Sequence, residues 1–185
     1  MRQLKRETLK AELIQVIKEK SLITGVTRVL TSGRTSTYYI DAKMTTLDPK
    51  GAQITARLIL DVLKEFEVDA IGGYTLGADP IVGAVAALSV DTGRPLPAFI
   101  VRKEPKKHGE RKMIEGPFKP GWRVVVVDDV VTTGGSTLKA CQAVEDEGGK
   151  VVLALALVDR LEGGKENIEE KGYKFVSLIT RDELL

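Results

Sequence analysis

The sequence predicts an α/β protein whose mainly parallel sheet is flanked by helices, and two observations support this prediction. From residue 48 onward, short segments with strand character alternate with amphipathic helical segments, a pattern typical of parallel strands joined by crossover helices. Four consecutive valines occupy positions 124–127, and such an unbroken β-branched run indicates a strand that is buried on both faces. Functional sites of these sheets lie outside the carboxyl ends of the strands.

The N-terminal third is expected to form a small cap on this sheet. A helix is predicted over residues 5–20, because apolar residues recur there at helical spacing: Leu9, Leu13, Ile14 and Ile17. Strand-like segments at 26–30 and 38–41 surround the turn-rich residues 31–37, which indicates a β-hairpin.

The core elements follow in order. Asp48 as N-cap and Pro49 in the first turn predict the start of a helix. Strands are then expected at residues 70–73, 97–101, 122–128, 151–158 and 175–178. Helices are expected between them at residues 80–89 and 136–147.

Composition excludes several classes of protein. The length of 185 residues fits one domain. A lone cysteine, Cys141, excludes an internal disulfide framework and a multi-cysteine zinc site. The longest apolar run, residues 151–158, is far below the roughly 20 residues of a membrane span. The N-terminus has no apolar signal region, and a net charge of +2 is too small to indicate nucleic acid. We therefore expect a cytoplasmic protein without a membrane or nucleic-acid partner.

The strongest functional signal is the segment 124–136. A buried strand is followed by Asp128 and Asp129, then by a loop rich in hydroxyl groups and glycine, then by a helix. Glycine lets the loop backbone approach a ligand closely, and its N–H groups together with the helix N-terminus favour a phosphate. Two carboxylates would repel that phosphate, so they suit sugar hydroxyls or a metal. A phosphorylated sugar offers both kinds of group; the alternative is a plain helix-capping turn.

Two other nucleotide-binding motifs are missing. A P-loop needs Gly-Lys followed by Ser or Thr, whereas Gly149-Lys150 precedes Val151 and Gly164-Lys165 precedes Glu166. The dinucleotide pattern G-x-G-x-x-G is interrupted by Tyr74.

A basic segment spans residues 102–112. Six of its eleven residues are Lys or Arg, two are acidic, and it holds the only histidine, His108. Pro105 and Gly109 favour a mobile loop over a helix. One interpretation is a solvated charged loop; a nucleic-acid patch is disfavoured because no aromatic residue interleaves the charges. Beside a phosphorylated sugar, these cations could stabilise a diphosphate leaving group.

The segment 124–136 resembles the motif of type I phosphoribosyltransferases that binds 5-phosphoribosyl 1-diphosphate (PRPP). The resemblance implies their fold, a mainly parallel sheet flanked by helices with a small N-terminal hood. It divides a single domain, residues 1–185, into the N-terminal helix and hood (1–47), the PRPP-binding core (48–160) and a closing segment (161–185). It also implies that Asp128 and Asp129 bind the ribose hydroxyls. The remaining implied PRPP-binding residues, of which the last five surround the 5-phosphate, are Val130, Val131, Thr132, Thr133, Gly134, Gly135 and Ser136.

The basic segment resembles the catalytic loop of one family, the orotate phosphoribosyltransferases, in which subunits of a homodimer share this loop. By position, the resemblance implies four catalytic residues that contact the diphosphate of PRPP: Arg102, Lys103, Lys106 and His108. Lys103 is expected to matter most for the transition state. The resemblance also implies Mg2+ as cofactor, carried mainly by PRPP, so no protein metal ligand is named.

Three further places resemble this family. Residues 32–41 resemble its hood over the base, and Arg160 takes the place of its orotate-binding arginine, with Thr132 also touching orotate. The guanidinium fork suits a carboxylate; the alternative for Arg160 is a surface ion pair with Glu162. Residues 72–80 resemble its pyrophosphate loop; the alternative is a plain glycine-rich turn. Thr31 and Thr75 stand where some members carry lysine, so any lysine contact is lost there.

The activity implied by the resemblance is transfer of ribose 5-phosphate from PRPP to N1 of orotate, giving orotidine 5'-monophosphate in pyrimidine biosynthesis. A purine phosphoribosyltransferase would share the PRPP site, but Arg160 and the segment 102–104 disfavour it. A PRPP-sensing regulator of transcription is a different alternative, for which 185 residues leave little room for a DNA-binding domain.

Overall fold

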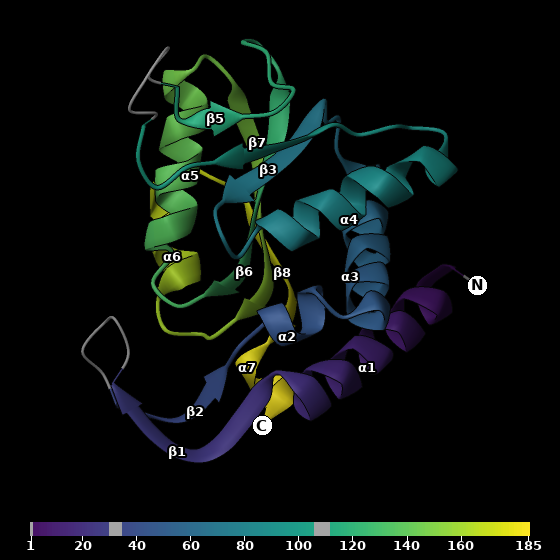
Figure 1. Ribbon diagram of the computed structural model, residues 1–185, viewed down its shortest axis with the longest axis vertical. Coiled ribbons are helices and arrows are strands. Elements are labelled where there is room, and N and C mark those ends of the chain that lie inside the picture. The colour runs from purple at the N-terminus through teal and green to yellow at the C-terminus, as the bar shows by residue number, and fades with distance from the viewer. Residues whose placement is uncertain (1, 30–34, 106–111) are drawn as a thin grey trace.

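The computed structural model describes residues 2–29, 35–105 and 112–185 and has a six-stranded sheet at its centre (Figure 1). The strand order is β5-β4-β3-β6-β7-β8, and every neighbouring pair is parallel except β4 with β5. The strands are β3 (Ala70–Tyr74), β4 (Ala98–Val101), β5 (Ile114–Glu115), β6 (Arg123–Val131), β7 (Lys150–Asp159) and β8 (Phe175–Thr180). The predicted α/β class with a mainly parallel sheet is confirmed.

Helices cover both faces of the sheet (Figure 1). One face carries α3 (Pro49–Val62) and α4 (Asp79–Ser89), with α1 (Arg2–Lys20) packed on α3. The other face carries α5 (Gly135–Asp146) and α6 (Gly164–Glu170). Strand β6 is apolar on both sides because both of its faces are covered by helices. Val125 and Val127 join the core beneath α3 and α4, whereas Val124 and Val126 pack against α5, because successive side chains of a strand point to opposite faces.

Strand β6 is longer than predicted, and this corrects the position of the acidic pair. The prediction ended the strand at residue 128, but Val130 and Val131 pair with Val158 and Asp159 of β7. Pairing with β3 ends at Gly73 and Val127. The acidic residues therefore lie within β6, at the point where its neighbour β3 has stopped pairing.

The N-terminal part forms the predicted hairpin, with different limits. Strands β1 (Leu22–Val29) and β2 (Thr35–Ile40) make an antiparallel two-stranded sheet, so residues 35–37 belong to a strand rather than to the turn. The predicted turn residues 31–34, including Thr31, lie outside the described residues. A short helix, α2 (Lys43–Thr46), was not predicted. The N-cap is confirmed, since the Asp48 carboxylate accepts hydrogen bonds from the N–H groups of Lys50 at 3.1 Å and Gly51 at 3.0 Å.

Short elements near the C-terminus also escaped prediction, namely α6 and α7 (Arg181–Leu184), as did β5 and the 3-10 helices η1 (Leu63–Glu65) and η2 (Val90–Thr92). Helix α7 packs against α1, where Lys10 and Glu183 form an ion pair at 2.8 Å. The closing segment thus returns to the N-terminal helix. Within the described ranges, no helix combines the length and the apolar character needed to cross a bilayer.

Candidate functional site

Asp128 is a buried carboxylate at the centre of the candidate site. Its side chain accepts a hydrogen bond from the Thr137 hydroxyl at 2.8 Å and one from the Asp129 backbone N–H at 3.0 Å. Burial, with a smaller contribution from the negative charge of Asp129, raises the pKa of Asp128 to about 7. The two neighbouring carboxylates therefore gain from hydroxyl donors or from a cation, as the residue pattern predicted. Thr137, which orients Asp128 from α5, was missed because only the packing of helix on strand brings it there.

The connection between β3 and α4 lies directly against this acidic pair. A Cβ atom on Gly77 would come within 2.4 Å of an Asp129 carboxylate oxygen, and one on Gly73 within 2.1 Å of the Val127 carbonyl oxygen. The Thr75–Leu76 peptide bond in this connection is cis. At Gly73 the backbones of β3 and β6 approach too closely for any side chain, whereas a side chain at Gly77 would have to displace the Asp129 carboxylate. The predicted pyrophosphate loop is thus brought to the predicted ribose-binding residues.

A hollow of about 450 Å³ opens beside Asp128 at the end of β6. Its lining consists of the predicted loop and one additional cation: Asp128, Val130, Val131, Thr132, Thr133, Gly134, Gly135, Ser136 and Lys139. We call residues 132–136 the cradle. Lys139 was not predicted, although its place three residues after Ser136 on a helix puts it on the same face. The hollow therefore combines open backbone N–H groups, hydroxyl groups and a positive charge.

The cradle is shaped by a glycine turn and supported by α6. Gly134 has a φ of 80° and precedes α5 without a side-chain cap, so the first N–H groups of the helix stay available for an anion. Behind it, the Asn167 side-chain amide donates a hydrogen bond to the Thr133 carbonyl oxygen at 3.0 Å. A Cβ atom on Gly164 would lie 2.8 Å from the Thr132 carbonyl oxygen. Helix α6 thus contacts the backbone of the cradle and stabilises its conformation.

Two of the four predicted catalytic residues, Arg102 and Lys103, lie among the described residues. Lys106 and His108 lie outside the described residues. The backbone N–H of Arg102 donates a hydrogen bond to the Met113 carbonyl oxygen at 2.9 Å, and this bond joins the two ends of the loop. The Arg102 guanidinium donates to the Glu115 carboxylate at 3.2 Å. Lys103 is exposed. Among the described residues, Arg102 therefore binds at the root of the loop and not at the cradle.

Arg160 is buried rather than part of a surface ion pair. Only 3% of the residue is exposed, its Nε donates to Glu162 at 2.9 Å, and its Cζ lies 4.6 Å from the centre of the Tyr38 ring. The backbone N–H of Arg160 donates a hydrogen bond to the Val131 carbonyl oxygen at 2.9 Å. This bond places Arg160 next to the start of the cradle. The ion pair considered as an alternative exists, but it lies between the core and the N-terminal hairpin.

Lys43 supplies a cation to the site that sequence reasoning missed. Its ammonium group contacts the Asp41 carboxylate at 2.9 Å. The hydrogen bond to Asp41 and, more weakly, the charge of Asp129 raise the pKa of Lys43. No local pattern relates residue 43 to residue 129, so only the folded chain brings the hood and the acidic pair together.

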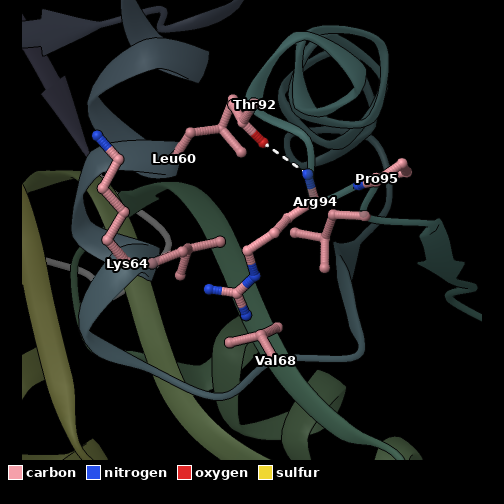
Figure 2. Close-up of a pocket in the computed structure, with 8 residues that line it drawn as sticks. Leu60, Lys64, Val68, Thr92, Arg94 and Pro95 are labelled. Atoms are coloured by element: carbon pink, nitrogen blue, oxygen red, sulfur yellow. Dashed lines mark hydrogen bonds between the residues drawn. The ribbon is translucent and has the colours of Figure 1, made fainter.

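A second pocket lies at the opposite end of the sheet, where β3 and β4 begin. Figure 2 shows Arg94 extending across it toward Val68, with Leu60 and Lys64 on one side. Its volume is about 130 Å³, and leucine, valine and proline form much of its lining. It has neither paired carboxylates nor a glycine-rich loop, and it faces the amino ends of the strands. The hollow at the end of β6 is therefore the candidate active site.

Known proteins are similar to this chain over most of its length. The family model described as "Phosphoribosyl transferase domain" matches residues 43–182. The orotate phosphoribosyltransferase of Aquifex aeolicus (strain VF5) is 47% identical over 176 residues, which cover 94% of this chain and 96% of that protein. The orotate phosphoribosyltransferase of Rhodopseudomonas palustris (strain BisB18) is 45% identical over 180 residues, with 95% and 96% covered.

Solved structures are similar as well. The crystal structure of Mycobacterium tuberculosis H37Rv orotate phosphoribosyltransferase with Fe(III) dicitrate has a TM-score of 0.85 at 38% identity, covering 95% of this chain and 98% of that chain. The structure of the same protein in complex with PRPP has a TM-score of 0.80 at 37% identity, with 95% and 98% covered.

Proposed function

This chain belongs to the orotate phosphoribosyltransferases, and from that premise we propose how its own residues bind the substrates and assist the reaction. The enzyme transfers ribose 5-phosphate from PRPP to N1 of orotate, giving orotidine 5'-monophosphate and diphosphate, a step of pyrimidine biosynthesis. The observation that carries the assignment of residues is the hollow in which Asp128 and the cradle lie together.

The proposed PRPP site uses the two parts of this hollow differently. Asp128 and Asp129 accept hydrogen bonds from the ribose 2- and 3-hydroxyl groups. The N–H and hydroxyl groups of residues 132–136 bind the 5-phosphate, and Lys139 adds a charge at its edge. Val130 and Val131 connect the acidic pair to the cradle and line the hollow between them. The raised pKa of Asp128 supports this division, because hydroxyl donors or a cation compensate the burial of its charge.

The proposed chemistry is displacement at C1 of the ribose. The bond from C1 to the diphosphate oxygen breaks, and a bond from orotate N1 to C1 forms as N1 gives up its proton, which the departing diphosphate takes. In the transition state, positive charge develops on the ribose ring and negative charge on the leaving group. Four loop residues neutralise the leaving group: Arg102, Lys103, Lys106 and His108. Lys103 contributes most, and Arg102 exchanges its contact with Glu115 for the diphosphate.

Magnesium dependence is part of the proposal, and the donor set fits it. Mg2+ prefers oxygen ligands and usually combines one or two carboxylates with substrate phosphates and water. The site offers Asp128 and Asp129, and within the described part of the chain no three or more ligating side chains form a cluster. These two carboxylates would face the ion while PRPP supplies most of its ligands. When bound, Mg2+ supplies charge neutralisation for the diphosphate.

Orotate recognition is assigned to Arg160 and Thr132. Arg160 lies at the end of β7 beside the cradle and beneath Tyr38 of the hood. A guanidinium group binds a carboxylate through two parallel hydrogen bonds. Orotate carries such a carboxylate and the purine bases do not, so Arg160 favours orotate over a purine substrate.

We also propose that the protein is a homodimer whose active sites share the basic loop, and that it lies in the cytoplasm. Three exposed apolar side chains close to the site support the dimer. They belong to α2, to the residue after it and to the β3–α4 connection: Met44 (58% exposed), Leu47 (70%) and Leu76 (62%). Sedimentation measures the oligomeric state. Mixing K103A with D128N tests the sharing of sites, because partial recovery of activity requires residues from two subunits.

The catalytic assignment is tested by mixing the pure protein with Mg2+, PRPP and orotate and following the loss of orotate absorbance. Orotate is expected to be consumed, whereas adenine, guanine and xanthine give no nucleotide product. Omission of Mg2+ is expected to abolish turnover. Turnover of a purine base would overturn the role of Arg160, and DNA binding without product formation would support the regulatory alternative.

A further inference from the structure

A sharp turn follows β7 and contains Arg160. Asp159 is 2% exposed and its carboxylate accepts a hydrogen bond from the Leu161 N–H at 2.8 Å. Leu161 has a φ of 56° and is the one non-glycine residue with positive φ in the described ranges. Its side chain is 42% exposed, so packing of that side chain does not account for the conformation. Such strain persists only where the surrounding structure imposes it, and it is concentrated at functional sites.

The turn brings the Glu162 carboxylate back to Arg160. The Arg160 side chain is buried and the Glu162 side chain is largely buried, with 4% and 13% exposed, and the contact at 2.9 Å is made by the guanidinium Nε. The Tyr38 ring covers the guanidinium at 4.6 Å. Burying an ion pair is costly because both charges lose their hydration, so this contact is weak evidence for a contribution to stability. The plane of the Arg160 guanidinium is thus set by Glu162 at its edge and by Tyr38 on its face.

The charges around this pair are balanced. Arg181, at the start of α7, interacts weakly with Glu162 and Tyr38, but its hydrogen bond and its closest ion pair are with Asp182. Arg160, Glu162, Arg181 and Asp182 together therefore carry no net charge. A preference for a carboxylate ligand thus depends on how the Arg160 guanidinium is oriented and not on a surplus of positive charge.

We propose that Glu162 is a positioning residue that orients Arg160 for the carboxylate of the base. Glu162 engages Nε, whereas a carboxylate that binds end-on uses the Nη1–Nη2 edge in the same plane. Holding that plane in advance reduces the ordering cost of binding. Glu162 thereby contributes to the preference for a pyrimidine that carries a carboxylate over uracil, which lacks one. The inference rests on the proposed role of Arg160 in orotate binding.

The decisive variants are E162L, E162Q and E162D. Leu removes the acceptor, Gln keeps an oxygen for Nε without the charge, and Asp keeps the charge but withdraws it by one methylene. Loss of a hydrogen bond to a charged group predicts that E162L raises KM for orotate by about 10- to 100-fold. KM for PRPP should change less than about twofold. E162Q should restore most of the affinity for orotate, and E162D should lie between wild type and E162L.

Two further measurements separate positioning from a merely structural role. The ratio of kcat/KM for orotate to that for uracil should fall in E162L, because only orotate presents a carboxylate to Arg160. Direct titration of orotidine 5'-monophosphate should weaken in parallel, independently of turnover. The exposed Glu166 of α6 gives a matched control, E166L, expected to keep wild-type values for both substrates.

The inference is overturned if E162L leaves KM for orotate unchanged, or if it raises both KM values equally together with a lower Tm. If E162L does not fold, the comparison of E162D with wild type decides in the same way. R160Q distinguishes the underlying assignment. An unchanged KM for orotate in R160Q refutes the role of Arg160 itself, whereas a raised KM in R160Q with a normal one in E162L refutes only the role of Glu162.

Discussion

Replacing Asp128 by Asn should stabilise the ligand-free protein and inactivate the enzyme. Asn keeps the shape of the side chain, and its oxygen can still accept from the Asp129 N–H while its amide donates to the Thr137 hydroxyl. It removes a negative charge that is buried beside Asp129. The variant therefore exchanges a functional charge for stability, as expected where a charge is retained for binding.

The magnitude follows from the pKa of Asp128, which burial and Asp129 raise from an ordinary 3.8 to about 7. Between these values the folded protein holds a proton that the unfolded chain has released, so the free energy of unfolding falls as pH rises through this window. At about 1.4 kcal/mol per pH unit, the full cost above pH 7 is about 4 kcal/mol. D128N should recover up to that amount, which corresponds to an increase in Tm of up to about 8–16 °C.

The assay is thermal unfolding of wild type and D128N from pH 4 to pH 8.5, without Mg2+ or PRPP. The advantage of D128N should be small at pH 4, grow through the window and level off above pH 7. The exposed Asp146, which accepts a hydrogen bond from Gln142, provides the control variant D146N with no such pH dependence. A D128N protein that is less stable than wild type at pH 8, or equally stabilised at every pH, refutes the argument. Activity with PRPP should fall by about 100-fold, because a charge-assisted hydrogen bond to a ribose hydroxyl is lost.

Three further predictions concern the surroundings of the site. K103A should lower kcat far more than it raises KM for PRPP, since Lys103 is proposed to act on the leaving diphosphate; an equal effect on both would indicate binding alone. G77A should displace the Asp129 carboxylate, which the new Cβ would approach to 2.4 Å. The variant should therefore have a higher KM for PRPP with little loss of Tm. The control is G83A, whose new Cβ has no atom within 4 Å and which should stabilise α4 by about 0.5–1 kcal/mol. N167A removes the hydrogen bond to the Thr133 carbonyl oxygen and should weaken ribose 5-phosphate binding by about 3- to 10-fold in a calorimetric titration while KM for orotate stays constant; unchanged phosphate affinity would mean that α6 does not support the cradle.

Local chemistry in the sequence predicted most of the long elements and the cradle. The alternation of strands and helices, the N-cap at Asp48 and the four valines at 124–127 depend on backbone preferences and on the period of apolar residues, which act over a few neighbouring positions. The cradle was predictable for the same reason, since its glycines, hydroxyl groups and helix start are consecutive. The resemblance to a family then supplied the substrate, to which the residue chemistry alone had pointed only as a phosphorylated sugar.

Short elements were missed because they owe their form to packing rather than to propensity. Strand β5 has two residues, and helices α2 and α7 have four each, lengths at which an isolated element is not stable in water. Helix α6 is likewise only seven residues long. It is held by its contact with the cradle, where Gly164 permits the close approach.

The class of fold and the segment that forms the cradle could be predicted from local patterns, because both depend on residues that are close together in the chain. The position of Asp128 and Asp129 inside a strand could not, since it is set by the register between β6 and β7. The same holds for the approach of Gly77 and Lys43 to Asp129 and for the burial of Arg160 beneath Tyr38. These contacts join segments that are distant in sequence, and their energies arise only when the sheet and the hood close around the site.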